Sequence, residues 1–200
     1  HTEYDKSEVI DFLELSDNHK YKQCLKTHMS NNKKCFSFEL VPGLFIFPQY
    51  FSLDEQKYWI QQSLYKYTQS NLYDNNLISL NEKNQTTKYT KEIRWTRLGE
   101  NYNWTEGVYQ NTSDNKIPED LKISIQQITK ELSLMDTNKE TIYDGYDPQV
   151  AFVNYYPQKG YMMAHQDKSE KTYNRPLISL SFGCSCIFLI GTDNRNDKPY

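Results

Sequence analysis

The stretch QVAFVNYYPQKGYMMAHQDKSEKTYNRPLISLSFGCSCIFLIGT, residues 149–192, decides the fold. It holds four short segments rich in β-branched and aromatic residues, separated by Pro, Gly, Lys or Asn: residues 149–156, 160–167, 176–183 and 185–192. Segments of this composition, bounded in this way, are typical of strands. Several short strands at close spacing predict a β-sandwich or barrel.

The sequence before this stretch predicts two helices and a further pair of strands. Ser52 followed by Glu55 has the capping-box pattern of a helix start. Apolar residues recur at four-residue spacing within residues 117–132, which predicts an amphipathic helix that presses one face onto a sheet. A Pro-Gly turn signal within residues 38–51 predicts a short strand on either side of it.

Two further regions differ from this pattern. Residues 1–36 are polar and charged, with a short apolar stripe from Val9 to Leu15, and we expect an N-terminal helical arm there, followed by one domain over residues 37–200. Residues 71–91 consist largely of Asn, Gln, Thr and Lys with little periodicity, which predicts a long surface loop.

Composition restricts the class of protein. The chain of 200 residues carries 17 Tyr, 9 Phe and 3 Trp, too many rings for a disordered chain. No apolar run is long enough for a membrane helix, and we expect no membrane partner. A net charge of −3 argues against nucleic-acid binding by bulk charge alone. Four cysteines without a zinc spacing fit a reducing compartment, and we interpret Cys184 and Cys186 as small thiols in a sheet core.

His165-Gln166-Asp167 is the most informative triplet for chemistry. Residues i and i+2 of a strand point to the same face, so the imidazole and the carboxylate would converge inside the mouth of the barrel. Two such ligands with open positions beside them suit Fe(II), with zinc as the competitor. The alternative is a partly buried histidine oriented by a neighbouring carboxylate.

Asn154 and Tyr156 show the same spacing on the preceding predicted strand. An inward amide and phenol need hydrogen-bond partners, and beside a metal they could bind a small dicarboxylate. The alternative places both side chains at a sheet edge, where they bond to water.

These residues, in this order, resemble the AlkB-like Fe(II)/2-oxoglutarate dioxygenases, and most of all the eukaryotic branch called AlkB homologue one. The resemblance covers roughly residues 40–195. It rests on VNYY at 153–156, HQD at 165–167, PLISLSFG at 176–183, IFL at 187–189, PGLFIFP at 42–48, Arg94-Trp95, Leu98-Gly99 and Tyr102-Asn103-Trp104.

The resemblance implies an α+β fold, a double-stranded β-helix (jelly roll) with flanking helices. It implies Fe(II) held by His165 and Asp167, which would be the catalytic pair, and 2-oxoglutarate held by Asn154 and Tyr156. It further implies oxidative demethylation of a nucleic-acid base with O2 as co-substrate. The remaining iron ligand of the family, a histidine followed by two arginines, lies further downstream, so we expect this chain to be truncated within the jelly roll. Ser169 stands where bacterial members carry a second acidic residue, which puts in doubt a preference for cationic bases.

Substrate-binding candidates interleave cations with aromatic rings, which could stack a base and contact phosphate. They are Arg94, Trp95, Arg97, Tyr102, Trp104 and, beside the metal motif, Ser169. The alternative is a core tryptophan pair with solvated arginines. Lysines at 83, 88, 91, 159, 168 and 171 and Arg175 add local positive charge that could contact phosphate, although such runs are usually solvated faces.

We therefore expect an enzyme that demethylates adenine in nucleic acid, with N6-methyladenine in DNA or N1-methyladenine in tRNA as its substrate. One alternative is a hydroxylase of protein side chains on the same fold. Another is a methyl-base or nucleic-acid binding module that has lost turnover. We expect an intracellular location, in the nucleus or mitochondrion rather than the cytoplasm.

Overall fold

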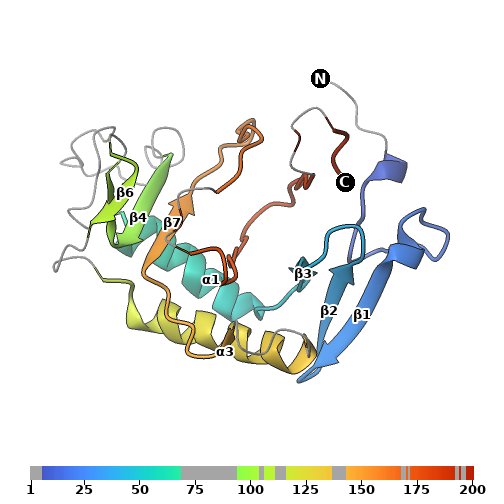
Figure 1. The fold of residues 1–200 in the computed structure, drawn as a ribbon, viewed down its shortest axis with the longest axis horizontal. Coiled ribbons are helices and arrows are strands. Elements are labelled where there is room, and N and C mark those ends of the chain that lie inside the picture. The colour runs from blue at the N-terminus through green and yellow to red at the C-terminus, as the bar shows by residue number, and fades with distance from the viewer. Residues whose placement is uncertain are drawn as a thin grey trace. The chain divides into compact units, whose positions relative to one another are not determined.

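The computed structural model describes residues 6–68, 94–103, 106–110, 116–136, 143–167, 170, 172–191, 194 and 197–200 (Figure 1). The chain divides into two compact units. The first comprises His1–Asp54 and Gly183–Tyr200, and the second comprises Glu55–Phe182. None of the described helices is both long enough and apolar enough to cross a membrane.

The first unit is built on a three-stranded antiparallel sheet, which sequence analysis anticipated only in part. Strands β1 (Leu25–Ser30), β2 (Lys33–Phe38) and β3 (Phe45–Ile46) lie in the order β1-β2-β3. The two-residue turn between β1 and β2 places Asn31 and Asn32 at φ values of 47° and 62°. Positive φ at both positions suits the twist of a hairpin, and asparagine tolerates it.

Three side chains of β2 form the core of this sheet. Cys35, Phe36 and Phe38 are buried, and Phe36 packs against the ring of Phe12. Burial raises the pKa of the Cys35 thiol to about 12, so this cysteine stays protonated at neutral pH. β2 crosses the expected domain boundary between residues 36 and 37, and that boundary stays a prediction.

The prediction of a helix in the N-terminal arm is wrong. The apolar stripe from Val9 to Leu15 is not helical, and the described arm has only the 3-10 turns η1 (Lys6–Glu8) and η2 (Lys22–Cys24). An isolated amphipathic stripe becomes a helix only where a partner buries it, and here Phe12 packs on β2 from an irregular segment. Of the two strands expected around the Pro-Gly turn, β3 follows the turn and β2 ends at Phe38 before it.

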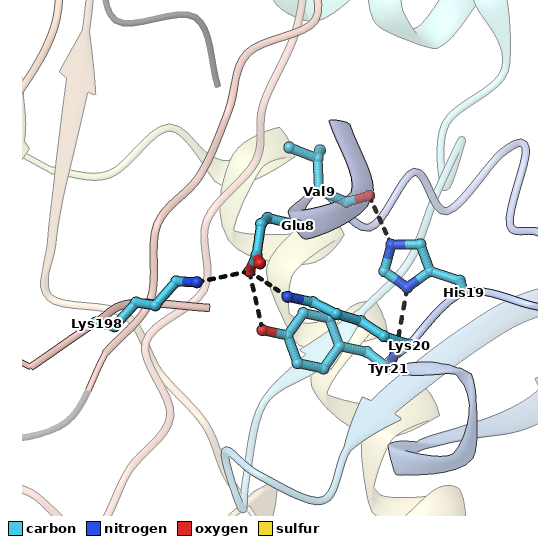
Figure 2. Close-up of polar contacts among 6 residues, drawn as sticks. All are labelled: Glu8, Val9, His19, Lys20, Tyr21 and Lys198. Carbon is cyan, nitrogen blue, oxygen red and sulfur yellow. Dashed lines mark hydrogen bonds and ion pairs between the residues drawn. The ribbon is translucent and has the colours of Figure 1, made fainter. Parts of the chain in front are cut away.

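Glu8 joins the N-terminal turn to two other segments of this unit (Figure 2). Its carboxylate contacts Lys20 and lies 3.1 Å from the ammonium of Lys198. These two cations lower the pKa of Glu8. The Tyr200 ring packs edge-on against Phe38 at 5.5 Å, and Ile190 and Tyr200 exchange two backbone hydrogen bonds.

Two helices are the largest elements described in the second unit. α1 (Leu53–Gln61) begins after Ser52 as expected and continues into a π-helical turn, η3 (Gln62–Lys66). α3 (Glu119–Met135) confirms the amphipathic helix predicted for residues 117–132. Its expected apolar face is buried: Leu121, Ile125, Ile128 and Leu132. The Tyr58 hydroxyl donates to Asp120 and so connects the two helices.

Two pairs of antiparallel strands complete this unit. β4 (Trp95–Gly99) pairs with β7 (Val150–Asn154), and β5 (Asn101–Asn103) pairs with β6 (Val108–Gln110). Gly99 ends β4 at φ +90°, and a Cβ built there would lie 2.0 Å from the carbonyl oxygen of Gln149. β7 confirms the strand predicted within residues 149–156.

The other three strands predicted in the deciding stretch are not formed. Residues 160–167, 176–183 and 185–191 have no strand pairing, and no closed barrel is present among the described residues. Apolar side chains expected in a core are exposed instead: Met163 is 77% exposed, Leu177 67% and Phe188 71%, and Cys184 and Cys186 are also exposed. Alternation signals a strand, but a ladder forms only where a neighbouring strand supplies its hydrogen bonds. The structure thus has helices and antiparallel strands.

Candidate functional site

β7 carries Asn154 at the end of the β4–β7 ladder. Asn154 lies directly opposite Trp95, and Phe152 lies opposite Arg97 on the same face. The rings of Trp95 and Phe152 meet at 5.8 Å in a T-shaped contact, and Asn154 is exposed. The backbone pairing continues one step further, because Tyr155 donates its N–H to the carbonyl of Arg94 at 2.9 Å.

The opposite face of this ladder is fastened to the end of the first helix. The Tyr155 hydroxyl donates to the carbonyl oxygen of Ser63 in η3 at 2.5 Å. The Thr96 hydroxyl donates to the carbonyl oxygen of Tyr67, directly after η3. Both bonds hold the strands against the helix end, so Asn154 projects from the other face. Sequence analysis missed Tyr155 as a positioning residue, although its place between Asn154 and Tyr156 signals the opposite face.

Tyr156 follows β7 and precedes a tight turn. Its hydroxyl donates to the sulfur of Met162 at 3.7 Å, and Gly160 donates its N–H to the carbonyl of Pro157. Tyr156 is 56% exposed. The amide of Asn154 and the phenol of Tyr156 are thus exposed hydrogen-bond donors at and just after the end of β7. A carboxylate can accept hydrogen bonds from such groups.

His165 and Asp167 lie close together although residues 160–167 form no strand. The Nε2 atom of His165 is 3.8 Å from Oδ1 of Asp167, and both side chains are about half exposed. The Nδ1 atom of His165 lies 2.8 Å from the carbonyl oxygen of Met163. A neutral imidazole that donates its Nδ1–H to this carbonyl keeps a lone pair on Nε2, on the side of Asp167.

This pair has the donor types that a divalent metal ion takes, an imidazole nitrogen and a carboxylate oxygen. The carbonyl of Met163 holds the imidazole ring on the side of Nδ1, in the way that outer partners orient metal-binding histidines. Within the described part of the chain, no group of three or more His, Cys, Asp or Glu side chains gathers at one point. His165 and Asp167 are therefore the two residues that would hold a metal ion there.

Three hydrogen bonds attach the segment around His165 and Asp167 to the rest of the second unit. Tyr109 in β6 donates its hydroxyl to Glu170, three residues after Asp167, at 3.1 Å. The guanidinium of Arg175 donates to the carbonyl of Asp144, and Tyr146 donates its hydroxyl to the carbonyl of Pro176. No sequence pattern marked these contacts, because each joins residues at least 30 positions apart.

The predicted substrate-binding residues differ in how exposed they are and in whether the structure describes them. Trp95 lies opposite Asn154 and is half-buried against Phe152, whereas the exposed Arg94 precedes it and is paired with Tyr155. Arg97 is only 4% exposed, which corrects its expected role in contacting phosphate. Arg97 lies opposite Phe152, on the same face of the ladder as Asn154, and its side chain is covered there. The side chain of Tyr102 and all of Trp104 and Ser169 lie outside the described residues, as do Lys83, Lys88, Lys91, Lys168 and Lys171.

A histidine and a carboxylate with open positions beside them are the donor types of non-haem iron oxygenases. The sequence agrees with this class: residues 43–200 match the sequence model of the 2OG-Fe(II) oxygenase superfamily, and the chain belongs to this superfamily. The match spans Asn154, Tyr156, His165 and Asp167. The resemblance to AlkB-like members is confirmed by the relatives described next.

The chain is 38% identical over 110 residues to the tRNA demethylase abh1 of Schizosaccharomyces pombe, covering 54% of this chain and 34% of the relative. It is 26% identical over 186 residues to the nucleic acid dioxygenase ALKBH1 of Mus musculus, covering 83% and 46%. It is 24% identical over 242 aligned residues to the DNA N(6)-methyladenine demethylase ALKBH1A of Arabidopsis thaliana, covering 98% and 68%. The chain thus spans between a third and a half of the first two relatives.

Proposed function

We propose that this protein is an Fe(II)/2-oxoglutarate-dependent dioxygenase that oxidatively demethylates adenine in nucleic acid. The observation that carries the proposal is the His165–Asp167 pair, with donor atoms 3.8 Å apart, inside the region that matches the oxygenase superfamily. The names of the relatives supply the substrate class, since they refer to demethylation of tRNA or DNA.

His165 and Asp167 would hold the iron through Nε2 and a carboxylate oxygen. Bound there, the ion would supply the activation of O2 that protein side chains cannot perform. The role of the chain is orientation: the Met163 carbonyl fixes the imidazole, and the Tyr109–Glu170 and Arg175–Asp144 contacts hold the segment that carries both ligands. Their half exposure leaves room beside the pair for further ligands.

Asn154 and Tyr156 would bind 2-oxoglutarate. Their amide and phenol groups are hydrogen-bond donors, and Tyr155 holds them on the exposed face of the ladder through its bond to Ser63. In the overall reaction, 2-oxoglutarate is oxidised to succinate and CO2 while O2 is reduced. One oxygen atom enters succinate and the other enters the methyl C–H bond, and the resulting hydroxymethyl group leaves as formaldehyde.

Trp95, which lies opposite Asn154, and Arg94, one residue before it, would contact the substrate. A methylated base must leave the duplex stack, or lie in a single strand, before its methyl group can reach His165 and Asp167. The exposed guanidinium of Arg94 suits a phosphate, and the partly exposed ring of Trp95 suits a base face. N6-methyladenine in DNA and N1-methyladenine in tRNA are the two substrates proposed, and Ser169, which adds no negative charge, favours the neutral N6-methyladenine.

Three finer features belong to the same proposal. The fold of the domain would be a jelly roll, with β4 and β7 as paired strands of it. We propose that the N-terminal segment up to residue 36 is an arm beside this domain. We also propose a nuclear or mitochondrial location, supported by four cysteines that are all free in the structure.

The test measures succinate release by the full-length protein supplied with Fe(II), 2-oxoglutarate, O2 and methylated oligonucleotides. We expect succinate and formaldehyde in equal amounts with N6-methyladenine in DNA or N1-methyladenine in tRNA, and none with unmethylated controls. Binding of the methylated oligonucleotide without succinate would instead identify a binding module. Succinate that depends only on added peptide would identify a protein hydroxylase, and either outcome overturns the proposal.

A further inference from the structure

Two adjacent methionines lie on the segment that leads into His165 and Asp167. Met162 is 50% exposed and Met163 is 77% exposed. A thioether that reaches solvent is open to oxidation by peroxide, which converts a flexible apolar side chain into a polar sulfoxide. The consequence of such a change depends on what each sulfur atom contacts.

The sulfur of Met162 contacts Tyr156, one of the two residues proposed for 2-oxoglutarate. The Tyr156 hydroxyl donates to this sulfur, and the oxygen and sulfur atoms are 3.7 Å apart. Met163 takes part in the site through its backbone instead, because its carbonyl oxygen lies 2.8 Å from Nδ1 of His165. The Met163 sulfur makes no hydrogen bond to another described residue. Oxidation of Met162 therefore changes the hydrogen bonding of the site directly.

The thioether of Met162 holds the Tyr156 phenol only weakly. A thioether sulfur is a weak hydrogen-bond acceptor, so the phenol can leave it and donate to a carboxylate instead. Tyr156 is 56% exposed, which leaves its hydroxyl accessible to a ligand that arrives from solvent. In the reduced protein Met162 thus keeps the phenol in place without competing strongly for its proton.

We propose that Met162 is an oxidation site that controls the binding of 2-oxoglutarate, a role that rests on the proposed function. Hydrogen peroxide transfers one oxygen atom to the sulfur. The O–O bond breaks and an S–O bond forms, the sulfur is oxidised, and the peroxide is reduced to water. The sulfoxide oxygen is a stronger acceptor than the thioether, so it retains the Tyr156 hydrogen bond that 2-oxoglutarate would otherwise accept.

Reduction of the sulfoxide restores the phenol for 2-oxoglutarate. Methionine sulfoxide reductases convert the sulfoxide back to the thioether, so the oxidation of Met162 is reversible. The two reactions that act on this residue are therefore oxidation by peroxide, which weakens the site, and enzymatic reduction, which restores it.

The experiment measures binding of 2-oxoglutarate to the full-length, Fe(II)-loaded protein by calorimetry, with O2 excluded so that no turnover occurs. The metal-free protein is first treated with hydrogen peroxide, then with a thiol that reduces oxidised cysteines, and then loaded with Fe(II). Oxidation should weaken binding about tenfold, as for one hydrogen bond to a charged group. A methionine sulfoxide reductase should restore the affinity, and peptide mass spectrometry should find an added oxygen atom on Met162.

Three variants assign the effect to one sulfur atom. Met162→Leu has a similar volume and no oxidisable atom, so its affinity should not change on peroxide treatment. Met162→Gln places a carbonyl acceptor where the sulfur was and should bind 2-oxoglutarate about tenfold more weakly than the wild type without any peroxide. Met29→Leu is the matched control, because it removes a similarly exposed methionine of the first unit. It should lose affinity on oxidation as the wild type does.

The outcomes separate this proposal from the proposed function. Equal affinity of the wild type before and after oxidation would overturn the role of Met162. An equal loss in Met162→Leu, or mass spectra without an oxidised Met162, would also overturn it. If the untreated wild type bound no 2-oxoglutarate, the proposed function would fail, and the role of Met162 with it. Met162→Leu changes a half-exposed side chain conservatively and keeps the test available if Met162→Gln does not fold.

Discussion

At the residue scale, Asp167 carries the proposed chemistry with little structural role. Its side chain is 54% exposed and contributes little to a core. We predict that Asp167→Ala abolishes succinate release and weakens Fe(II) binding, because a carboxylate ligand is lost, while the melting temperature stays unchanged. Calorimetric Fe(II) titration and succinate assays check both parts. Glu106→Ala, at an exposed carboxylate of the same unit, is the control and should keep full activity.

Gly99, the last residue of β4, pairs with Val150 at the start of β7 and lies close to the backbone there. Its φ of +90° disfavours any side chain, and an added Cβ would lie 2.0 Å from the carbonyl oxygen of Gln149. We predict that Gly99→Ala lowers the free energy of unfolding by about 3 kcal/mol. Urea denaturation measures this change. Gly145→Ala, also at positive φ but with no atom within 4 Å of the added Cβ, should cost only about 1 kcal/mol.

At the scale of elements, the contact between η3 and β7 positions the residues proposed for 2-oxoglutarate. Tyr155→Phe removes the hydroxyl that donates to the Ser63 carbonyl. We predict that it raises the KM for 2-oxoglutarate and leaves kcat nearly unchanged, because Asn154 loses its fixed position but the metal pair does not. The unfolding free energy should fall by about 1 kcal/mol, as for one lost hydrogen bond.

The matched control for Tyr155→Phe is Tyr143→Phe. The Tyr143 hydroxyl donates to Asp136 just after α3, and neither residue belongs to the β4–β7 ladder. This variant should lose similar stability and keep the wild-type KM for 2-oxoglutarate. An unchanged KM in Tyr155→Phe, or an equal change in both variants, would contradict the positioning role.

At the scale of the whole molecule, Glu8 joins segments near the two ends of the chain within the first unit (Figure 2). Lys20 and Lys198 lower its pKa below the ordinary value of 4.5. A carboxyl whose pKa is lower in the folded than in the unfolded state stabilises the protein fully above that ordinary value. The stabilisation is lost as the pH falls through the folded pKa.

We therefore predict that Glu8→Gln lowers the melting temperature at neutral pH, and that the difference from the wild type shrinks below pH 4.5 and disappears once the pH is below the folded pKa of Glu8. Thermal unfolding followed over a series of pH values measures this. Glu14→Gln changes the net charge equally at an exposed position and should leave the wild-type pH profile intact. A constant difference between Glu8→Gln and the wild type at all pH values would contradict the role of the ion pairs.

Elements whose sequence pattern is local were predicted correctly, and elements that depend on distant partners were not. The helix over residues 117–132 was predicted correctly, because the three- and four-residue spacing of Leu121, Ile125, Ile128 and Leu132 is a property of the helix itself. The β1–β2 hairpin was missed although Asn31-Asn32 is a turn signal, because lysines and threonine between apolar residues obscured the alternation. The strands predicted at 160–167 and 176–183 depended on partners that the local sequence does not specify.

The sequence alone determined the superfamily, the residue types of the proposed metal site and the helical periodicity, because these depend on chemical identity and on spacing along the chain. Only the tertiary structure decided that Arg97 is buried while Arg94 is exposed, that Tyr155 is anchored on Ser63, and that Tyr109 holds the segment after Asp167. Each of these facts depends on residues brought together from distant parts of the chain. Packing and hydrogen bonding act between neighbours in space, which one-dimensional spacing does not specify.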